Sequence, residues 1–378
     1  MIISLLLVVV IYLLFKKNAF IWLPTYICQY FSRKHQDNSL THIIFCFVDH
    51  FEPQWKKPSY EVEVARVDRW CEDYRQLASK YLDADGCHPK HTFFYPEEEY
   101  REEHLNKLAK MCSEGYGEIE IHLHHDNDTE AGLRNKLSSF TRTLRDKHGA
   151  ISEFQDGRLA WAFIHGNWAL DNSHPNGKWC GINNELVILK EEGCYVDMTM
   201  PSAPSPTQTS KINSIYYATD DPEKPKSHNT GIDVQSGKSP CGDLMMVQGI
   251  LGWDWTSRKW GVIPRIENSD IRSTQLPTKS RVDNWVRLAP TVKDRPEWKF
   301  IKIHTHGTQE ADMPVLLGNP ADQMHKYLEN KYNDGTRYCL HYVSAREQFN
   351  IIKAAEDGLI GNPNDFRNYV LPPPPHLR

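Results

Sequence analysis

From residue 40 onward, short apolar runs alternate with stretches in which apolar residues recur at helical spacing. The strand-like runs are residues 42–48, 91–95, 117–124, 159–166, 194–200, 298–304 and 338–343. The helix-like stretches are residues 60–82, 97–112, 128–147, 182–193, 281–288, 320–331 and 345–357. Repeated units of a buried strand followed by an amphipathic helix are typical of parallel sheets. The pattern therefore predicts an α/β fold, a distorted (β/α) barrel of seven or eight strands with helices outside.

Residues 201–280 interrupt this alternation. The stretch begins with "PSAPSPTQTSK" and contains the turn-rich loop 220–231, and both compositions are typical of connecting segments. Short strand-like runs at 212–218, 244–251 and 260–267 predict an inserted β-hairpin region. We therefore expect a barrel over residues 40–365 with an insertion at about 201–280, followed by an extended Pro-rich tail over 366–378.

The N-terminus is far more apolar than the rest of the chain. Residues 1–15 carry no charge and are followed by Lys16 and Lys17, and a second apolar stretch covers residues 19–31. Because the first run is short for a bilayer span of about 20 residues, the second stretch would extend it or lie in the membrane interface. We predict that residues 1–35 form an uncleaved single-pass membrane anchor and juxtamembrane segment. The basic residues that follow it favour a catalytic domain on the cytoplasmic side.

Charge and cysteine content narrow the possible partners. The net charge is −5 and no long basic run occurs, which argues against binding of nucleic acid. The nine cysteines are scattered singly, without a C-x-x-C pair, as is common in a reducing compartment. Nothing in the sequence indicates a protein partner.

Histidine and aspartate gather where the predicted strands end. They are Asp49, His50, His122, His124, Asp126, His165, His304 and His306, with Trp168 close behind His165. In a parallel barrel these strand ends meet over one pocket, and imidazole and carboxylate are ligands of zinc and similar ions. His122 would share a face with His124, or would converge with Asp126 if the chain turns at once. The alternative is a hydrogen-bonded barrel rim that holds no ion.

The order of these motifs resembles the polysaccharide deacetylase (NodB-homology) superfamily. The resemblance rests on Asp49-His50 in "VDHFEP", on "EIEIHLHHDND" with His122 and Asp126, and on "IKIH" with His304. That family begins with an Asp-Asp pair and continues with two histidines four residues apart, so this chain has His50 and Asp126 exchanged in type. The family's arginine motif has no counterpart, because "IHGNWALDN" stands in its place.

The resemblance implies a distorted barrel and a divalent metal, which we expect to be zinc. His50, His122 and Asp126 would be the metal ligands, Asp49 the general base and His304 the general acid. Because the residue types are exchanged relative to the family, Asp49 and His50 could also have the opposite roles. We expect a further group to line the pocket and orient the sugar: His124, His165, Trp168 and His306.

The predicted function is removal of N- or O-acyl groups from a membrane-associated glycan or a lipid-linked sugar by a metal-dependent hydrolase. Two alternatives stay open. One is a glycosidase or another amidohydrolase on the same barrel, for which Glu52, Glu97 and Glu98 offer carboxylates. The other is a non-catalytic, membrane-anchored glycan-binding or scaffold protein.

Overall fold

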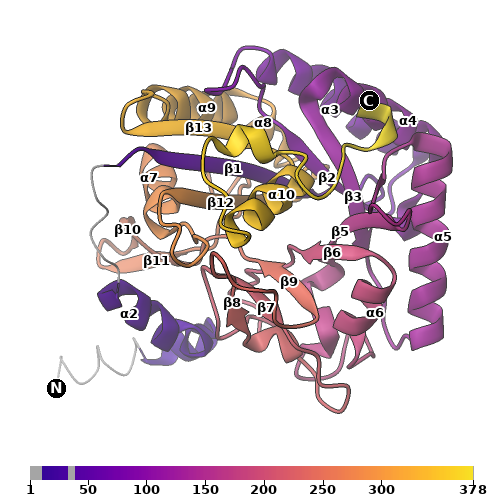
Figure 1. Cartoon of the computed structure of the whole chain (residues 1–378), viewed down its shortest axis with the longest axis horizontal. Helices are drawn as coiled ribbons and strands as arrows, with labels where there is room; N and C mark the ends of the chain where they lie inside the picture. The colour runs from indigo at the N-terminus through magenta and orange to yellow at the C-terminus, as the bar shows by residue number, and fades with distance from the viewer. Residues whose placement is uncertain (1–10, 33–38, 378) are drawn as a thin grey trace.

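The centre of the protein is one large sheet (Figure 1). The computed structural model describes residues 11–32 and 39–377, and among them an eleven-stranded sheet has the order β12-β1-β2-β3-β5-β6-β9-β7-β8, with β13 beside β1 and β4 beside β5. The strands are β1 (Thr41–His50), β2 (His91–Pro96), β3 (Gly117–Leu123), β4 (Ser152–Glu153), β5 (Leu159–His165), β6 (Cys194–Asp197), β7 (Ile215–Ala218), β8 (Ile232–Asp233), β9 (Leu244–Val247), β12 (Trp298–Thr305) and β13 (Tyr338–Val343).

Most of the strand pairs are parallel. β1 is parallel to β12, β13 and β2, and the run β2-β3-β5-β6-β9 continues in the same sense. β7, β8 and β4 pair antiparallel. The predicted α/β class with a parallel sheet is thus confirmed. The hydrogen-bonded order of the described strands runs from β12 to β8, so these strands form a sheet with two ends rather than a ring closed by hydrogen bonds.

The region predicted as an insertion has two parts. β10 (Gly252–Lys259) and β11 (Ile263–Glu267) form a separate antiparallel hairpin, in agreement with the expected hairpin. β9, in contrast, is parallel to β6 and extends the main sheet, with β7 and β8 beyond it. Residues 201–280 therefore complete one edge of the sheet as well as adding a hairpin to it.

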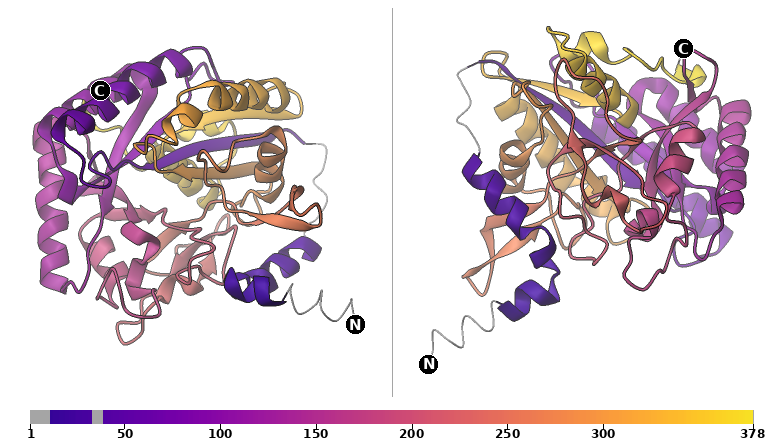
Figure 2. Two further views of the ribbon diagram at one scale, coloured as in Figure 1. Left: turned by 180° about the vertical axis from the view of Figure 1, so that it is seen from behind. Right: turned by 60° about the horizontal axis from the view of Figure 1, so that its bottom comes forward.

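Helices cover the outer face of the sheet (Figure 2). The α-helices of the described residues include α2 (Leu23–Ser32), α3 (Tyr60–Ala78), α4 (Glu102–Met111), α5 (Glu130–His148), α6 (Glu185–Glu191), α7 (Lys279–Leu288), α8 (Met313–Leu316) and α9 (Asn319–Tyr332), and also α10 (Ala345–Glu356), which lies on the opposite face. Their apolar faces explain this arrangement. Val67, Trp70 and Tyr74 of α3 are buried in one cluster with Phe45 and Phe47 of β1, as amphipathic spacing requires.

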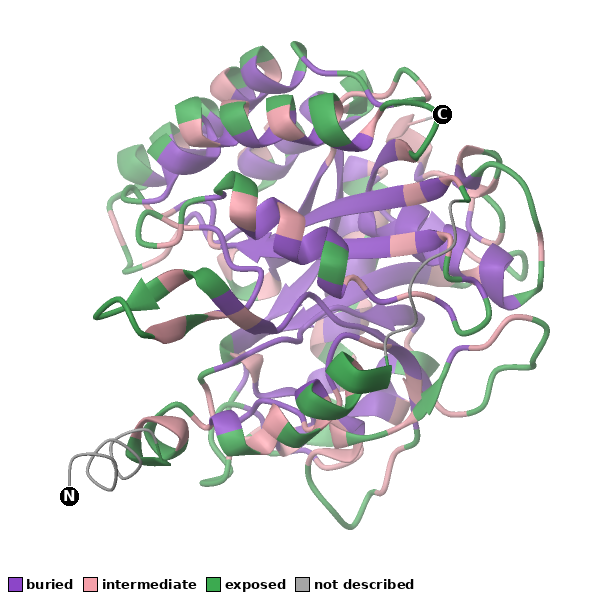
Figure 3. Ribbon diagram, turned by 90° about the vertical axis from the view of Figure 1, so that its left-hand side faces the viewer, coloured by how far each residue is buried: buried purple, intermediate pink, exposed green. Residues whose placement is uncertain are grey.

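The opposite face of the sheet is filled by α10. Val48 and Cys46, which alternate with Phe47 and Phe45 along β1, pack in a second cluster with Phe349 and other residues of α10. A strand buried on both faces reads as a continuous apolar run, and Figure 3 shows the strands buried almost throughout. All of α10 is buried except Lys353, which is half-buried. The C-terminal tail packs over this helix, since Leu371 is fully buried.

The described part of the N-terminal segment packs on the domain. The short helix η1 (Ala19–Ile21) precedes α2, and Trp22 and Tyr26 are buried, with the Trp22 ring 5.3 Å from that of Trp253 on the hairpin. In residues 11–32 and 39–377, we find no helix with both the length and the apolar character needed to span a bilayer. Residues 1–10 and 33–35 of the predicted anchor lie outside the described residues.

Candidate metal centre and catalytic pocket

The parallel strands bring five histidines together at their carboxyl ends. The His50 ring centroid lies 4.9 Å from that of His122, 4.5 Å from His306 and 6.4 Å from His304. His124 is 4.5 Å from His122. The strand register explains why these histidines lie together, because Val48 of β1 pairs with His304 of β12. Side chains of the same parity then project to the same side of the sheet.

Glu52 lies at the centre of these imidazoles. Its Oε1 atom is 3.3 Å from Nε2 of His122 and 3.5 Å from Nε2 of His124. Donor atoms of Glu52, His50 and His306 lie within 4.8 Å of one another, and so do those of Glu52, His122 and His124. Residues of these types at these separations could hold a divalent metal. Sequence reasoning treated Glu52 only as an available carboxylate, although its place two residues after His50 was a usable signal.

Two of the imidazoles are oriented by contacts behind them. His122 donates from Nδ1 to the backbone oxygen of Ile164 at 2.7 Å, and His124 donates from Nδ1 to Oε1 of Glu98 at 2.5 Å. Each ring therefore presents its Nε2 atom to Glu52. Metal-binding histidines usually have their second nitrogen fixed to a carboxylate or a carbonyl in this way.

Burial keeps most of these imidazoles neutral. It lowers the pKa of His122 to about 3 and that of His306 to about 4, and it places the pKa of His50 and His304 well below the usual value. Desolvation disfavours the charged ring, and the neighbouring histidines add to the effect. Neutral imidazole is the form that binds a metal, so the site is ready for an ion at neutral pH.

Asp49 and Asp126, two of the predicted site residues, lie elsewhere. Asp49 points to the helix-covered side of β1, where it accepts hydrogen bonds from Nε2 of His91 at 2.9 Å and from the backbone of Gly307 at 2.6 Å. Asp126 is exposed and accepts from the backbone of Trp179 at 2.6 Å. Strand alternation separates Asp49 from His50. For Asp126, the chain reverses at Asn127, whose φ is 48°.

Trp168 and His304 form part of the pocket. The Trp168 ring lies 6.1 Å from that of His50 and 5.8 Å from that of His306. Both Asn167 and Trp168 have positive φ, 53° and 55°, a conformation that is uncommon outside glycine. This tight turn after β5 brings the indole beside the histidines. His304 has its Nδ1 atom 3.5 Å from Oγ of Ser269.

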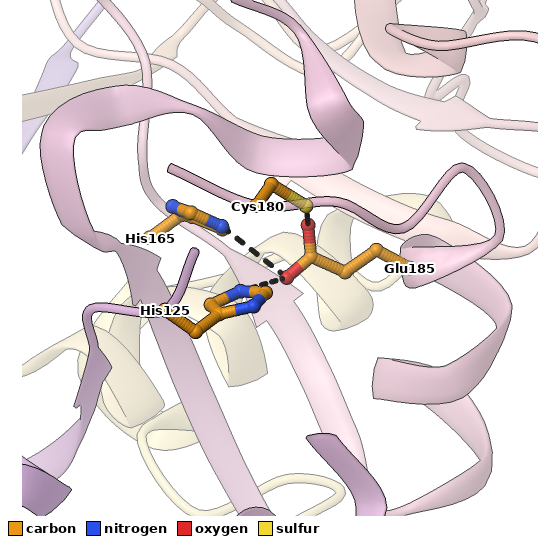
Figure 4. Close-up of side chains that lie close together, drawn as sticks. All are labelled: His125, His165, Cys180 and Glu185. Atoms are coloured by element: carbon orange, nitrogen blue, oxygen red, sulfur yellow. Dashed lines mark hydrogen bonds and ion pairs between the residues drawn. The ribbon is translucent and has the colours of Figure 1, made fainter. Parts of the chain in front are cut away.

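His165 belongs to a second group behind the pocket (Figure 4). Its ring is 4.7 Å from that of His125, and donor atoms of His125, His165, Cys180 and Glu185 all lie within 4.8 Å of one another. This buried set could hold a metal ion. No pattern in the sequence marks Cys180 and Glu185, because they come from a loop and from the first turn of α6 and meet the strand ends only in the folded chain.

Comparison with known proteins finds distant structural similarity and no sequence match. No protein-family model matches the sequence, and no curated protein sequence matches it. Among solved structures, the chain is similar to the 4-alpha-glucanotransferase from Thermococcus litoralis, with a TM-score of 0.42 and 10% sequence identity over 82% of this chain. It spans 40% of the length of that protein. The fold and site thus define an α/β protein with a largely buried cluster of histidines around Glu52 at the strand ends, and the resemblance to polysaccharide deacetylases stays a prediction.

Proposed function

We propose that this protein is a metal-dependent hydrolase that acts on a carbohydrate. The observation that carries the proposal is the convergence of His50, His122, His124 and His306 on Glu52 at the carboxyl ends of parallel strands. A hydrogen-bonded rim would leave such rings paired to solvent or backbone. Here the Nε2 atoms of two rings face one buried carboxylate.

Each residue has a role in this proposal. His50, His122, His306 and Glu52 would hold the metal, with Glu52 in the place expected for Asp126. A divalent metal, which we propose to be zinc, would supply Lewis acidity and an activated water when bound. His304, which burial keeps neutral, would have to take up a proton in the reaction before it passes one to the leaving group. His124 and Trp168 would orient the sugar, and Asp49 would position His306 through its hydrogen bond to Gly307.

Two types of bond are candidates for cleavage. The first is the amide or ester of an acylated sugar, as the sequence predicted. The second is a glycosidic bond, which is favoured by Glu52 and Glu98 because these carboxylates contact opposite nitrogens of the His124 ring at 3.5 and 2.5 Å. Paired carboxylates are the groups that glycosidases use to cleave this bond.

We propose that the substrate is a glycan or lipid-linked sugar at a membrane. The proposed single-pass anchor in residues 1–35 is supported by the apolar outer surface of the segment that follows residue 10, and the proposed cytoplasmic side rests on Lys16 and Lys17. Phe20 is 49% exposed and Phe31 of α2 is 80% exposed. On the adjacent hairpin, Trp260 is 68% exposed. Aromatic residues of this kind are enriched at membrane interfaces.

The test combines metal analysis with a panel of acylated and unacylated glycans. The wild-type protein should contain zinc and should release either acetate or a new reducing end. His122→Ala should lose metal and reduce turnover by about 100-fold or more. The matched control is His88→Ala, because His88 is half-buried outside the pocket and bonds only the backbone of Tyr81.

The outcomes separate the candidates. Acetate release without new reducing ends assigns acyl hydrolysis, and new reducing ends that disappear in Glu98→Gln assign glycosidic cleavage. A wild-type protein that binds glycans but has neither metal in the pocket nor turnover would be a binding or scaffold protein, and the hydrolase proposal would be withdrawn. Full metal content and full activity in His122→Ala would also refute it.

A further inference from the structure

We propose that His125, His165, Cys180 and Glu185 form a closed, structural zinc site that is separate from the pocket. The four side chains come from the residues after β3, the end of β5, the loop before α6 and the start of α6. They offer two imidazole nitrogens, one sulfur and one carboxylate oxygen (Figure 4). Mixed nitrogen, sulfur and oxygen donors are the ligand types of protein zinc sites.

Three printed contacts of Glu185 with the other donor atoms are close to the ligand–ligand separations around a tetrahedral ion, and all four donor atoms lie within 4.8 Å of one another. Oε1 of Glu185 is 3.1 Å from Nε2 of His125 and 3.5 Å from Nε2 of His165. Oε2 of Glu185 is 3.4 Å from Sγ of Cys180. With zinc–ligand bonds of about 2.0–2.3 Å, the edges of a ligand tetrahedron are about 3.3–3.7 Å long. The four groups are therefore already gathered at near-ligand spacing.

The outer nitrogen of His165 is held as in metal sites, whereas that of His125 faces a carboxylate without a hydrogen bond to it. His165 donates from Nδ1 to the backbone oxygen of Gly166 at 2.6 Å, and Nδ1 of His125 faces Oδ2 of Asp128 at 3.3 Å. Both Nε2 atoms consequently point into the group. Nε2 of His165 is buried and has no hydrogen-bond partner among residues 11–32 and 39–377, which is costly for a polar atom and is explained if that atom binds an ion.

Burial distinguishes this group from the pocket. The side chains of His125, His165 and Glu185 have no exposed surface, and Cys180 is fully buried as well. Around Glu52, His122 is equally buried, but His124 keeps 32% of its side-chain surface exposed and His306 is half-buried. Structural zinc sites are filled by four protein ligands, whereas catalytic sites leave one position open. A closed site has no place for substrate, so its role would be to fix the fold locally.

Its position links it to the pocket. His125 follows His124 directly, and His165 lies three residues before Trp168. An ion bound by His125 and His165 would tie together the two strand ends that carry these pocket residues, and would connect them to the start of α6. This site does not depend on the proposed function, because its ligands would form it even if the pocket held no metal.

The experiment is cobalt substitution of the full-length protein. Tetrahedral cobalt bound to a thiolate gives a sulfur-to-metal charge-transfer band in the near ultraviolet, and the proposal predicts this band in the wild-type protein. Cys180→Ser should abolish it and remove about one equivalent of zinc from the protein as purified. Cys194→Ser is the matched control, since Cys194 is also a buried free cysteine and belongs to none of the converging groups.

Several results would overturn the site. They are the absence of the band in cobalt-loaded wild-type protein, persistence of the band in Cys180→Ser, or equal loss of the band in Cys194→Ser. The wild-type spectrum decides the matter if Cys180→Ser does not fold. His122→Ala should keep the band while losing metal from the pocket, so failure of the proposed function and failure of this inference give different spectra.

Discussion

The sharpest test of the packing is the buried ion pair that attaches α10 to the sheet. Arg346 donates to both oxygens of Glu118 on β3, at 2.8 and 2.9 Å, and only 2% of either side chain is exposed. Glu118→Gln would keep the shape but leave the guanidinium charge unbalanced. Removing one partner of a buried pair costs about 3–5 kcal/mol. Because Arg346 also donates to the backbone of Leu371 at 2.9 Å, we expect the lower end of that range.

The assay is urea unfolding followed by circular dichroism, with the free energy of unfolding compared at equal slope. The control is Glu102→Gln, which breaks an exposed pair with Lys147 whose side chains are 52% and 58% exposed. Such surface pairs contribute little to the free energy of unfolding, so this variant should unfold at the same urea concentration as the wild type. A loss below about 1 kcal/mol in Glu118→Gln would refute the claim that the pair holds α10 against the sheet.

Two further predictions follow from close contacts and burial. Gly166→Ala would place a Cβ atom 2.3 Å from Cδ2 of His124 and 2.8 Å from the backbone oxygen of Leu123. It should cost about 1–3 kcal/mol in urea unfolding and weaken metal binding in the pocket, and unchanged stability would contradict the contact. Burial raises the pKa of Glu329 to about 7. Its contribution to stability is therefore complete below its ordinary pKa of 4.5 and is lost as the pH rises through 7. Glu329→Gln should show a smaller difference in melting temperature between pH 5 and pH 8 than the wild type, and an equal difference would contradict the shift.

Much of the fold could be predicted from hydrophobic periodicity. Parallel strands buried on both faces leave continuous apolar runs, and β1, β2, β3, β5, β12 and β13 all fall on runs identified in the sequence. β10 could not be predicted, because half of its sequence "GWDWTSRK" is exposed and it mixes polar with aromatic residues. An edge hairpin of this kind has no core-facing stripe to mark it.

The position of α10 could not be predicted. Its sequence "AREQFNIIKAAE" has the polar content of a surface helix, yet it is buried on nearly all sides. Its polar side chains find partners that are distant in sequence: Glu118 for Arg346, Lys90 for Glu347 at 2.5 Å, and the backbone of Leu371 for Asn350 at 2.9 Å. Only the folded chain supplies those partners, so periodicity alone predicts an outer helix.

The candidate-site residues that lie on strands could be predicted, because the alternation of side chains along a strand determines which side they face. His50, His122 and His304 were chosen because they lie at strand ends, and the parallel register brings them together. Parity also explains why Asp49 points to the opposite side of β1 from His50. Beyond the strand ends the rule fails, since the direction of a loop residue depends on turns that the sequence does not specify. Asp126 and Glu52 lie in such segments.

The same alternation divides the histidines between two centres. In residues 122–125, His122 and His124 share one side of the chain and face Glu52, whereas His125 turns to Glu185 on the other side. A change that shifts this segment along its axis would therefore disturb both groups at once. Gly166, in the turn directly after β5, enforces the arrangement, because the His124 ring occupies the place of a side chain there. Both groups thus depend on the position of residues 122–125. A metal bound to the group of His125 and Glu185 would therefore also affect the positions of His122 and His124.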